Sequence, residues 1–433
     1  MHVSILALLL AWPTTKDFAP TETWPQWRGP TADSVSPTAD LPTEWSTTKN
    51  VAWTAPLPGW SASTPAIWGD AIFVTSQLDE HLLAMRLDRK TGAIVWKDEV
   101  GTGIPRRKGT VGNGRFHDEH NMATPSPTTD GQLVWFHYGT GDVGCYDFAG
   151  KRVWHKNLTE SFGPYTVWWG HANSPVLVDD LLVMICCQDP KDGGRSYVVA
   201  LDKRTGEKKW EAERITGAKA EPADAYTTPL VHRTPTGTEL IVFGGNVLNA
   251  YDAATGKELW ESKVFSGNRV ISGPTLAGDT VFATQGMRGP VFAIKTGGQG
   301  DVTKSNLRWS FKGGTPDAAC PVVAKGLVFL ANNDGAALCL DEKTGKEQWK
   351  QRLGGAFRAT PLVVGDKIYF FGKDGTTTIV AAERAFRTIA TSELGEDVMA
   401  SPAVAGHELY LRTKKHLYRI ESGKSIQSAQ STK

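Results

Sequence analysis

The stretch Asp341-Glu342-Lys343-Thr344-Gly345-Lys346-Glu347-Gln348-Trp349 decides the fold, because the chain repeats it. Related phrases end at Trp96, Trp210 and Trp260, and a shortened one ends at Trp154. In each phrase an Asp side chain can bond backbone two residues on, Gly supplies a turn position with positive φ, and Trp follows at a fixed distance. Such self-similarity predicts a repeat architecture in which the flat indole docks against a neighbouring unit.

A second recurring signal, a small residue followed by proline, opens each unit. The pairs are Thr64-Pro65, Thr124-Pro125, Ser174-Pro175, Thr228-Pro229, Gly273-Pro274, Cys320-Pro321, Thr360-Pro361 and Ser401-Pro402. Proline is tolerated at the first position of a strand, where its missing N–H is not needed. A turn, a strongly apolar strand and the Asp-to-Trp phrase follow, giving four strands in about 40 to 45 residues. The sequence therefore predicts an all-β fold, an eight-bladed β-propeller of four-stranded antiparallel blades.

The two ends of the chain are predicted to share one blade. The last unit, residues 401–422, is too short for a fourth strand, and residues 51–54 form a strand with no partner upstream. Pairing this N-terminal strand with the last blade closes the ring and leaves no exposed sheet edge. Unit seven departs from the pattern, because residues 381–386 replace the turn phrase and no Trp follows.

The remaining segments have simple expected roles. Residues 3–12 are an apolar run too short to span a bilayer, so residues 1–20 are predicted to be a signal peptide and the protein to be periplasmic or secreted. Residues 21–48 are expected to be an irregular leader, residues 49–422 the propeller and residues 423–433 a flexible tail. A formal net charge of +1 gives no long-range field for nucleic acid or an anionic membrane.

The phrase Ala-x-Asp-x-x-Thr-Gly-x-x-x-Trp, at residues 200–210 and 250–260, resembles the tryptophan-docking motif of pyrroloquinoline-quinone (PQQ) type propellers. Residues 24–30 and 120–127 are similar to PQQ-like repeat proteins of planctomycete-type bacteria. The resemblance covers residues 24–422 and implies the propeller fold. This superfamily contains quinoprotein alcohol dehydrogenases and also BamB, a non-catalytic member of the outer-membrane barrel-assembly machinery, so the fold alone leaves the function open.

Three consecutive connections between units are enlarged. From Trp to the next Pro they measure 29, 21 and 19 positions after Trp96, Trp154 and Trp210, against 12 to 14 elsewhere. Long loops on a rigid scaffold are where binding tends to occur, and residues just before each small-Pro pair should lie at the channel mouth. The candidate ligand-binding residues are His120, Asn121, Trp169, His171, Tyr226, Arg269, Asp317 and Arg358. Alternatively, these polar side chains only bond one another in a wet channel.

Two other motifs contain residue types that bind metal ions or anions, but we assign no site to them. His117-Asp118-Glu119-His120 contains metal-ligand types, with His171 as a third candidate, but the spacing matches no defined metal motif. Arg106-Arg107-Lys108 could contact an anion, although exposed basic residues are more often only solvated.

The cysteines are expected to be structural. The resemblance implies a comparison for Cys186-Cys187, since quinoprotein alcohol dehydrogenases carry a vicinal disulfide at their cofactor. Adjacent strand residues point to opposite faces, which disfavours that bond here. The absence of Cys-x-x-Cys-His implies no attached c-type haem.

Two function classes remain. The first, which we favour, is a non-catalytic propeller that binds a small ligand or a partner protein through the enlarged loops. The alternative is a PQQ- and Ca²⁺-dependent quinoprotein dehydrogenase of alcohols or sugars, in which the ion polarises the quinone. That alternative requires Glu119, Asn121, Asp317 and Trp169 to converge on one pocket. No catalytic residue is assigned.

Overall fold

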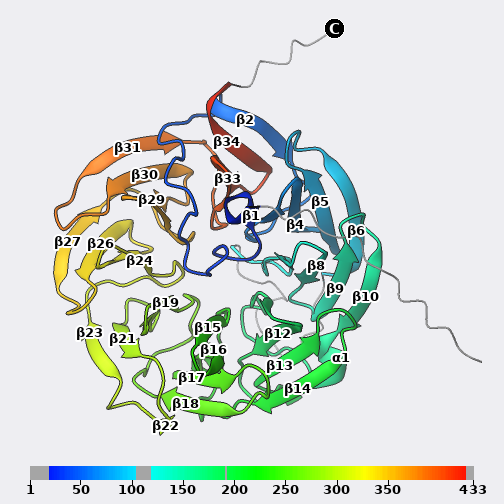
Figure 1. Ribbon diagram of the computed structural model, residues 1–433, viewed down its shortest axis with the longest axis vertical. Helices are drawn as coiled ribbons and strands as arrows, with labels where there is room; N and C mark the ends of the chain where they lie inside the picture. The colour runs from blue at the N-terminus through cyan, green and yellow to red at the C-terminus, as the bar shows by residue number, and fades with distance from the viewer. Residues whose placement is uncertain (1–18, 104–118, 191–192, 426–433) are drawn as a thin grey trace, which may run out of the picture.

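The computed structural model describes residues 19–103, 119–190 and 193–425. These residues form eight sheets arranged as blades around a central channel (Figure 1), as the repeated phrase predicts. Each blade is antiparallel, with its first strand at the channel and its fourth on the rim. Within these residues, no helix is long and apolar enough to cross a membrane.

The strands of the first four blades follow in chain order. Blade 1 contains β3 (Ala66–Trp68), β4 (Ala71–Leu78), β5 (His81–Asp88) and β6 (Ile94–Thr102). Blade 2 contains β7 (Thr128–Thr129), β8 (Leu133–His137), β9 (Asp142–Asp147) and β10 (Arg152–Asn157). Blade 3 contains β11 (Val176–Val178), β12 (Leu181–Cys186), β13 (Tyr197–Asp202) and β14 (Lys208–Glu213). Blade 4 contains β15 (Leu230–Thr234), β16 (Gly237–Gly244), β17 (Val247–Asp252) and β18 (Glu258–Ser262).

The other four blades complete the ring. Blade 5 contains β19 (Thr275–Ala277), β20 (Thr280–Thr284), β21 (Val291–Lys295) and β23 (Leu307–Phe311). Blade 6 contains β24 (Val322–Ala324), β25 (Leu327–Ala331), β26 (Ala336–Asp341) and β27 (Glu347–Arg352). Blade 7 contains β28 (Leu362–Val364), β29 (Lys367–Phe371), β30 (Thr376–Ala381) and β31 (Thr388–Glu393). Blade 8 contains β32 (Ala403–Ala405), β33 (Glu408–Arg412), β34 (His416–Ser425) and β2 (Lys49–Pro56).

Short elements decorate the ring. Strand β1 (Thr23–Trp24) pairs with β3, and β22 (Gly300–Asp301) adds a parallel edge to blade 4 beside β18. The helical pieces are η1 (Pro20–Glu22), α1 (Leu158–Phe162) and η4 (Glu221–Ala223).

The hydrophobic core lies between neighbouring blades. Middle strands such as β8 and β25 are buried along their whole length, whereas the rim strand β6 is largely exposed. A middle strand has a blade against each of its faces, so it is apolar on both, and this produces the continuous apolar runs in the sequence. One buried cluster, for example, joins residues of blades 1 and 2, and another joins blades 2 and 3.

The repeated phrase joins each blade to the next. Trp210 of blade 3 donates its indole N–H to Ala253 O in the turn of blade 4, at 3.1 Å, and its ring lies against Gly256 of that turn. Gly256 has φ +74°, and a methyl group there would overlap the Trp210 ring. The same indole-to-carbonyl bond is made by Trp53, Trp96, Trp154, Trp309 and Trp349.

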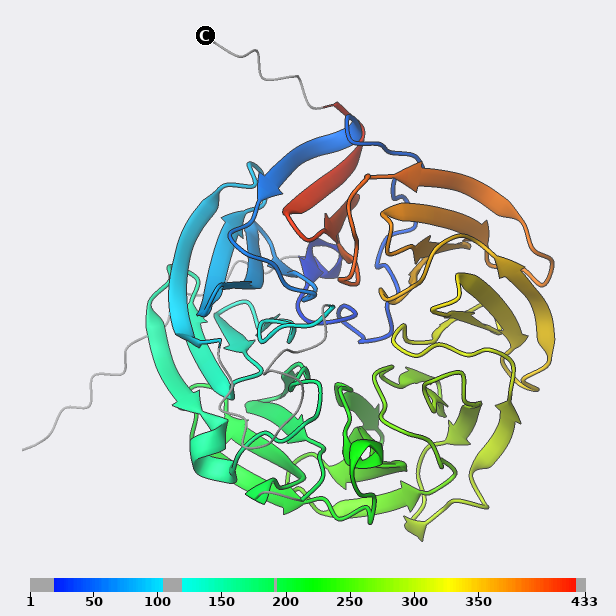
Figure 2. The ribbon, with the colours of Figure 1, turned by 180° about the vertical axis from the view of Figure 1, so that it is seen from behind.

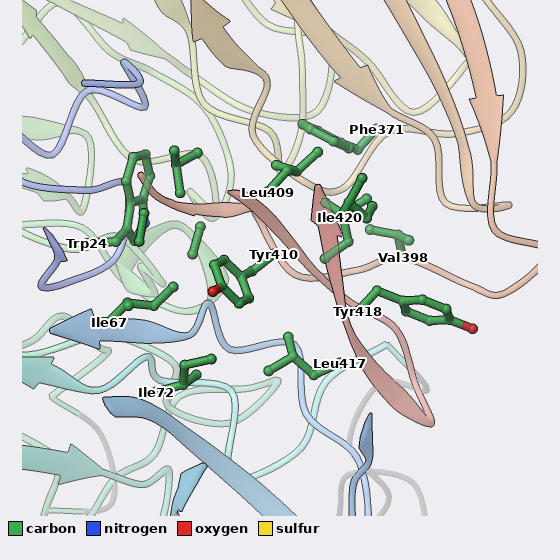
Figure 3. Close-up of a cluster of buried hydrophobic side chains, with 14 of the residues drawn as sticks. Trp24, Ile67, Ile72, Phe371, Val398, Leu409, Tyr410, Leu417, Tyr418 and Ile420 are labelled. Atoms are coloured by element: carbon green, nitrogen blue, oxygen red, sulfur yellow. The ribbon is translucent and has the colours of Figure 1, made fainter. Parts of the chain in front are cut away.

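Blade 8 explains why blade 7 lacks a tryptophan. Strands β34 and β2 come from opposite ends of the chain and pair from Lys49–Ser425 to Pro56–His416, so no turn joins them for an indole to dock on. Instead, Trp45 of the leader is buried beside blade 7, stacked 6.3 Å from Tyr369. Figure 3 shows the closing cluster, in which Tyr410 and Leu417 lie on the side of Ile72 of blade 1 and Leu409 lies on the side of Phe371 of blade 7.

Residues 23–35 cross the channel, and residues 36–48 then run along blade 7 to its rim strand β31. The segment starts at blade 1, where Trp24 pairs with Ile67, and bridges to blade 7, where Val35 pairs with Val363. Between these points the buried Arg28 guanidinium bonds Pro274 O at 2.7 Å and Pro321 O at 3.2 Å, in blades 5 and 6. Figure 1 shows this segment over the centre of the ring, and Figure 2 shows the opposite face, where the connections between blades surround the centre.

Candidate functional site

A cavity of about 210 Å³ lies at the channel mouth, on the face of the connections between blades. All eight blades contribute to its wall. The aromatic residues are Trp27, Trp169 and Tyr226, the hydroxyl-bearing ones are Thr124, Ser126, Ser174, Thr228, Thr360 and Ser401, and the charged ones are Glu119, Arg269, Asp317 and Arg358. His120, Ala62, Ala172, Ile271, Ala318 and Met399 complete the lining.

The floor of the cavity comes from the leader. Trp27 lies against Gly273, where a side chain would come within 2.9 Å of the indole. The Arg28 guanidinium lies 5.4 Å from the Trp27 ring and is itself fixed by the carbonyls of blades 5 and 6. Burial lowers the pKa of Arg28, yet these acceptors stabilise its charge. Trp27 was not among the residues predicted for the site, because the leader does not repeat.

Hydroxyl groups link the blades just below the cavity. Ser126 N–H donates to Ser174 Oγ at 2.9 Å, and Ser174 N–H donates to Thr228 Oγ1 at 3.1 Å. On the other side of the ring, Thr360 N–H donates to Ser401 Oγ at 3.0 Å. These bonds fix adjacent blades relative to one another, so the wall is rigid. They also show that the pair opening blade 2 is Ser126-Pro127, directly before β7, and not the predicted Thr124-Pro125.

Six of the eight predicted site residues line this cavity, namely His120, Trp169, Tyr226, Arg269, Asp317 and Arg358. Asn121 and His171 do not. The Asn121 amide donates to Trp60 O at 2.8 Å and its carbonyl accepts from Ala123 N–H. His171 is buried, contacts Ile185 O through Nε2 at 3.0 Å and stacks 4.1 Å from Tyr165. Burial holds the pKa of His171 well below its usual range, as expected of a neutral structural histidine.

Trp169 is positioned by blade 4 and its entering loop. Its N–H bonds Tyr226 Oη at 3.2 Å, and its indole N–H bonds Glu221 Oε1 at 3.2 Å. Trp168, whose N–H donates to Asp224 Oδ2 at 2.7 Å, remains 44% exposed. Trp169 therefore forms a fixed wall, while Trp168 faces solvent.

The cavity's charged groups form two separate clusters. Glu119 Oε2 lies 2.7 Å from Arg358 Nε, and Glu119 Oε1 is paired with Lys373 Nζ. The other cluster is looser: Arg269 lies 3.5 Å from Asp317 and 3.4 Å from Glu221. Each carboxylate of the lining is therefore paired with a cation.

A sequence profile described as "Outer membrane protein assembly factor BamB" matches residues 35–189, 194–318 and 298–430. The chain belongs to this family. The BamB of Burkholderia pseudomallei is 22% identical over 378 residues, which are 84% of this chain and 85% of that protein.

Solved structures of BamB and of an enzyme share the fold with this BamB-family chain. The Moraxella catarrhalis BamB structure matches with a TM-score of 0.59 at 13% identity, covering 85% of this chain and 99% of that one. Quinohemoprotein alcohol dehydrogenase from Comamonas testosteroni matches with a TM-score of 0.67 at 12% identity, covering 94% of this chain and 82% of that one. At such identities the likeness establishes the architecture alone.

This BamB-family cavity does not offer the calcium shell that a quinoprotein cofactor needs. Of the residues that this alternative requires, the carboxylates Glu119 and Asp317 and the aromatic Trp169 line the cavity, and the amide Asn121 does not. The two carboxylates belong to different clusters, each neutralised by arginine, and Ca²⁺ requires several oxygen ligands around one point. Among the described residues, no group of three or more His, Cys, Asp or Glu is arranged to hold a metal ion.

The vicinal cysteines do not line the cavity. Cys186 and Cys187 are buried free thiols that belong to the clusters on opposite faces of blade 3, as strand alternation predicts. His117, Asp118 and the Arg106-Arg107-Lys108 segment fall outside the described residues.

Proposed function

We propose that this chain is a non-catalytic binding propeller that works outside the cytoplasm and holds a small ligand, or a segment of a partner protein, in the channel-mouth cavity. The observation that carries this proposal is the cavity itself. A rigid ring closes its sides, Trp27 forms its floor, and aromatic, hydroxyl and guanidinium groups converge on one space. Concave sites with apolar walls and a few fixed polar groups are the usual form of a binding site.

The family supports a partner protein as one source of the ligand. The matching profile and the Burkholderia relative are both described as outer membrane protein assembly factors. A location in the periplasm or outside the cell is a prediction from the apolar run at residues 3–12.

The quinoprotein dehydrogenase is the weaker alternative. An aromatic wall suits a flat quinone, but a Ca²⁺ ion would have to compete with Arg358 and Lys373 for Glu119 and with Arg269 for Asp317. We therefore assign no catalytic residue and derive no reaction step.

Ligand-observed NMR with a library chosen without regard to charge tests the proposed function. The library contains neutral, cationic and anionic fragments, short peptides, and PQQ with and without Ca²⁺. We expect saturable binding at a Kd of about 1 mM or below, corresponding to roughly −4 kcal/mol. Binding should weaken at least about tenfold in the double variant Ala172→Phe, Ala318→Phe, which fills the cavity.

The control is the double variant Ala172→Ser, Ala318→Ser, which keeps the cavity open. If no compound binds in a way that the filled variant abolishes, the proposed function is wrong. If PQQ binds only with Ca²⁺, the dehydrogenase alternative replaces it.

A further inference from the structure

We propose that the cavity recognises a carboxylate attached to an apolar group, and that Glu119 occupies the position of that carboxylate on Arg358 and Lys373 until the ligand displaces it. This inference rests on the proposed function and adds the chemical class of the ligand. It also assigns Glu119 a role as an internal competitor.

The Glu119 side chain reaches across the ring to its partners. Glu119 belongs to the connection that enters blade 2, whereas Arg358 precedes blade 7 and Lys373 lies in the hairpin between β29 and β30 of blade 7. Blades 8 and 1 stand between them. The carboxylate thus spans the mouth and meets two cations at once, one on each oxygen.

Backbone hydrogen bonds hold the positions of the two cations in blade 7. Lys373 N–H donates to Ala356 O at 2.8 Å, and Lys373 O accepts from Val398 N–H at 3.0 Å, so the connections that enter blades 7 and 8 hold its backbone. Phe357, next to Arg358, bridges to Gly372 of the same blade. Glu119 instead lies on the longest connection of the ring, 29 positions from Trp96 to Pro125. Displacement is therefore expected to move the anion and to leave the cations in place.

Leaving Arg358 and Lys373 without a neighbouring anion would cost free energy. Arg358 and Glu119 are only 21% and 17% exposed. A half-buried guanidinium beside an ammonium requires a counter-charge, because the field between two cations is poorly screened away from bulk water. A ligand carboxylate can supply the same counter-charge as Glu119, since both present two oxygens, one for each cation.

The wall beside this pair offers apolar surface next to two hydroxyl groups. Going round the ring from Arg358 through blades 8 and 1, the cavity is lined by Met399 and Ala62, with Trp27 below, and also by Thr360 and Ser401. A ligand whose carboxylate sits on Arg358 and Lys373 would therefore place its adjoining group against methyl, thioether and indole surface. This favours a carboxylate joined to an aliphatic or aromatic group over a small inorganic anion.

Isothermal titration of 4-phenylbutyrate and its neutral amide tests the inference on the full chain. We expect wild type to bind the acid better than the amide, and Glu119→Gln to strengthen acid binding about tenfold or more. An internal group that occupies a site nine-tenths of the time reduces apparent affinity about tenfold. The double variant Arg358→Gln, Lys373→Gln should lose the preference for the acid and keep its affinity for the amide, which also reports that the cavity is intact.

Asp317→Asn is the matched control, because it removes one negative charge from the same cavity beside Arg269 instead of Arg358. It should change acid binding by less than about threefold, since the charge it removes does not occupy the proposed position. Equal effects of Asp317→Asn and Glu119→Gln would show a general charge effect and overturn the inference. So would equal binding of acid and amide, or no gain in Glu119→Gln.

Peptides that end in phenylalanine, with a free or an amidated C-terminus, identify the source of the carboxylate. Tighter binding of the free-ended peptide than of phenylbutyrate would assign the site to a protein C-terminus, and the reverse to a small acid. The NMR fragment library described above separates the two proposals. If only neutral or cationic fragments bind in the cavity, this inference is wrong and the proposed function still holds.

Discussion

Asp224 is a buried carboxyl beside the cavity that should titrate near neutral pH. Only 3% of the residue is exposed, and burial raises the pKa of Asp224 to about 7, although hydrogen bonds from the backbone of Trp168 and Asp189 oppose the rise. Its Oδ2 accepts the N–H of Trp168, which precedes the wall residue Trp169. Protonation of Asp224 therefore changes the charge on a group that holds the Trp168–Trp169 loop in place.

We expect Asp224 to make the fold less stable as the pH rises. The folded pKa lies above the unfolded value of about 3.9, so the folded state binds more protons between these values and the free energy of unfolding falls with pH. From pH 5 to pH 8 the loss should be on the order of 2 kcal/mol. Asp224→Asn does not titrate, so its free energy of unfolding relative to wild type should rise by this amount from pH 5 to pH 8. Denaturation of both proteins at the two pH values measures this rise. A difference that is constant with pH would contradict the assigned pKa.

The cavity residues show what the sequence could and could not predict. In all eight blades the residue three positions before the proline that opens the first strand lines the cavity, namely Ala62, Thr124, Ala172, Tyr226, Ile271, Ala318, Arg358 and Met399. Successive residues of an extended chain point to opposite sides, so His171, four positions before Pro175, points back into the blade. Asn121, six positions before Pro127, likewise bonds the backbone of Trp60. The rule of three positions before the proline would therefore have predicted much of the cavity wall. Asp317, also four positions before, reaches the cavity from an irregular loop, which alternation does not describe.

At the scale of the element, the turn phrase works because its glycine has no side chain and so leaves room for the tryptophan ring of the preceding blade. Gly256 illustrates both requirements, a positive φ and contact with the Trp210 ring. This local rule made the fold predictable from sequence, whereas the reason why unit seven lacks a tryptophan came from the pairing of β2 with β34. Blade 5 departs from it: residues 295–306 replace its turn phrase, β22 pairs with β18, and Trp260 Nε1 has no hydrogen-bond partner among the described residues.

Gly256→Ala should therefore be more harmful than alanine at a glycine with free space. Gly278 is the control, because its φ is +57° and nothing lies within 4 Å of an added methyl group. We expect a cost of about 1 kcal/mol for Gly278→Ala, from the backbone alone. Gly256→Ala should cost about 1 to 3 kcal/mol more, because the Trp210 ring must move. Urea denaturation measures both, and equal costs would show that the indole adapts freely.

At the scale of the whole molecule, the ring depends on contacts between its two ends. Glu408 of blade 8 pairs with Arg89 of blade 1 at 2.7 Å and with Arg419 of its own blade, and Arg89 also pairs with Glu22 of the leader at 2.5 Å. The side chains of Arg89 and Glu408 are each 12% exposed. Repetition predicted that the ends would meet, but this network and the path of the leader come from residues that occur once, so no pattern indicated them.

Glu408→Ala should weaken ring closure. Removing the carboxylate leaves two largely buried guanidinium groups short of a partner, and breaking such a pair costs about 3 to 5 kcal/mol, less what Glu22 and Glu421 recover. Glu383→Ala is the control, because the Glu383–Arg387 pair is exposed and should contribute less than about 1 kcal/mol. Hydrogen exchange should accelerate in β2 and β34 before it does in β13 and β14. Uniform acceleration around the ring would argue against a closure-specific effect.

The position of Trp27 makes the channel a cup and not a tube. A propeller open at both ends could let a polypeptide thread through its centre, but here the leader blocks one end between blades 1, 5, 6 and 7. Whatever binds must insert a chain end or a single side group and must leave by the way it came. A ligand of the cavity would therefore enter and leave through the same opening and could not pass through the ring.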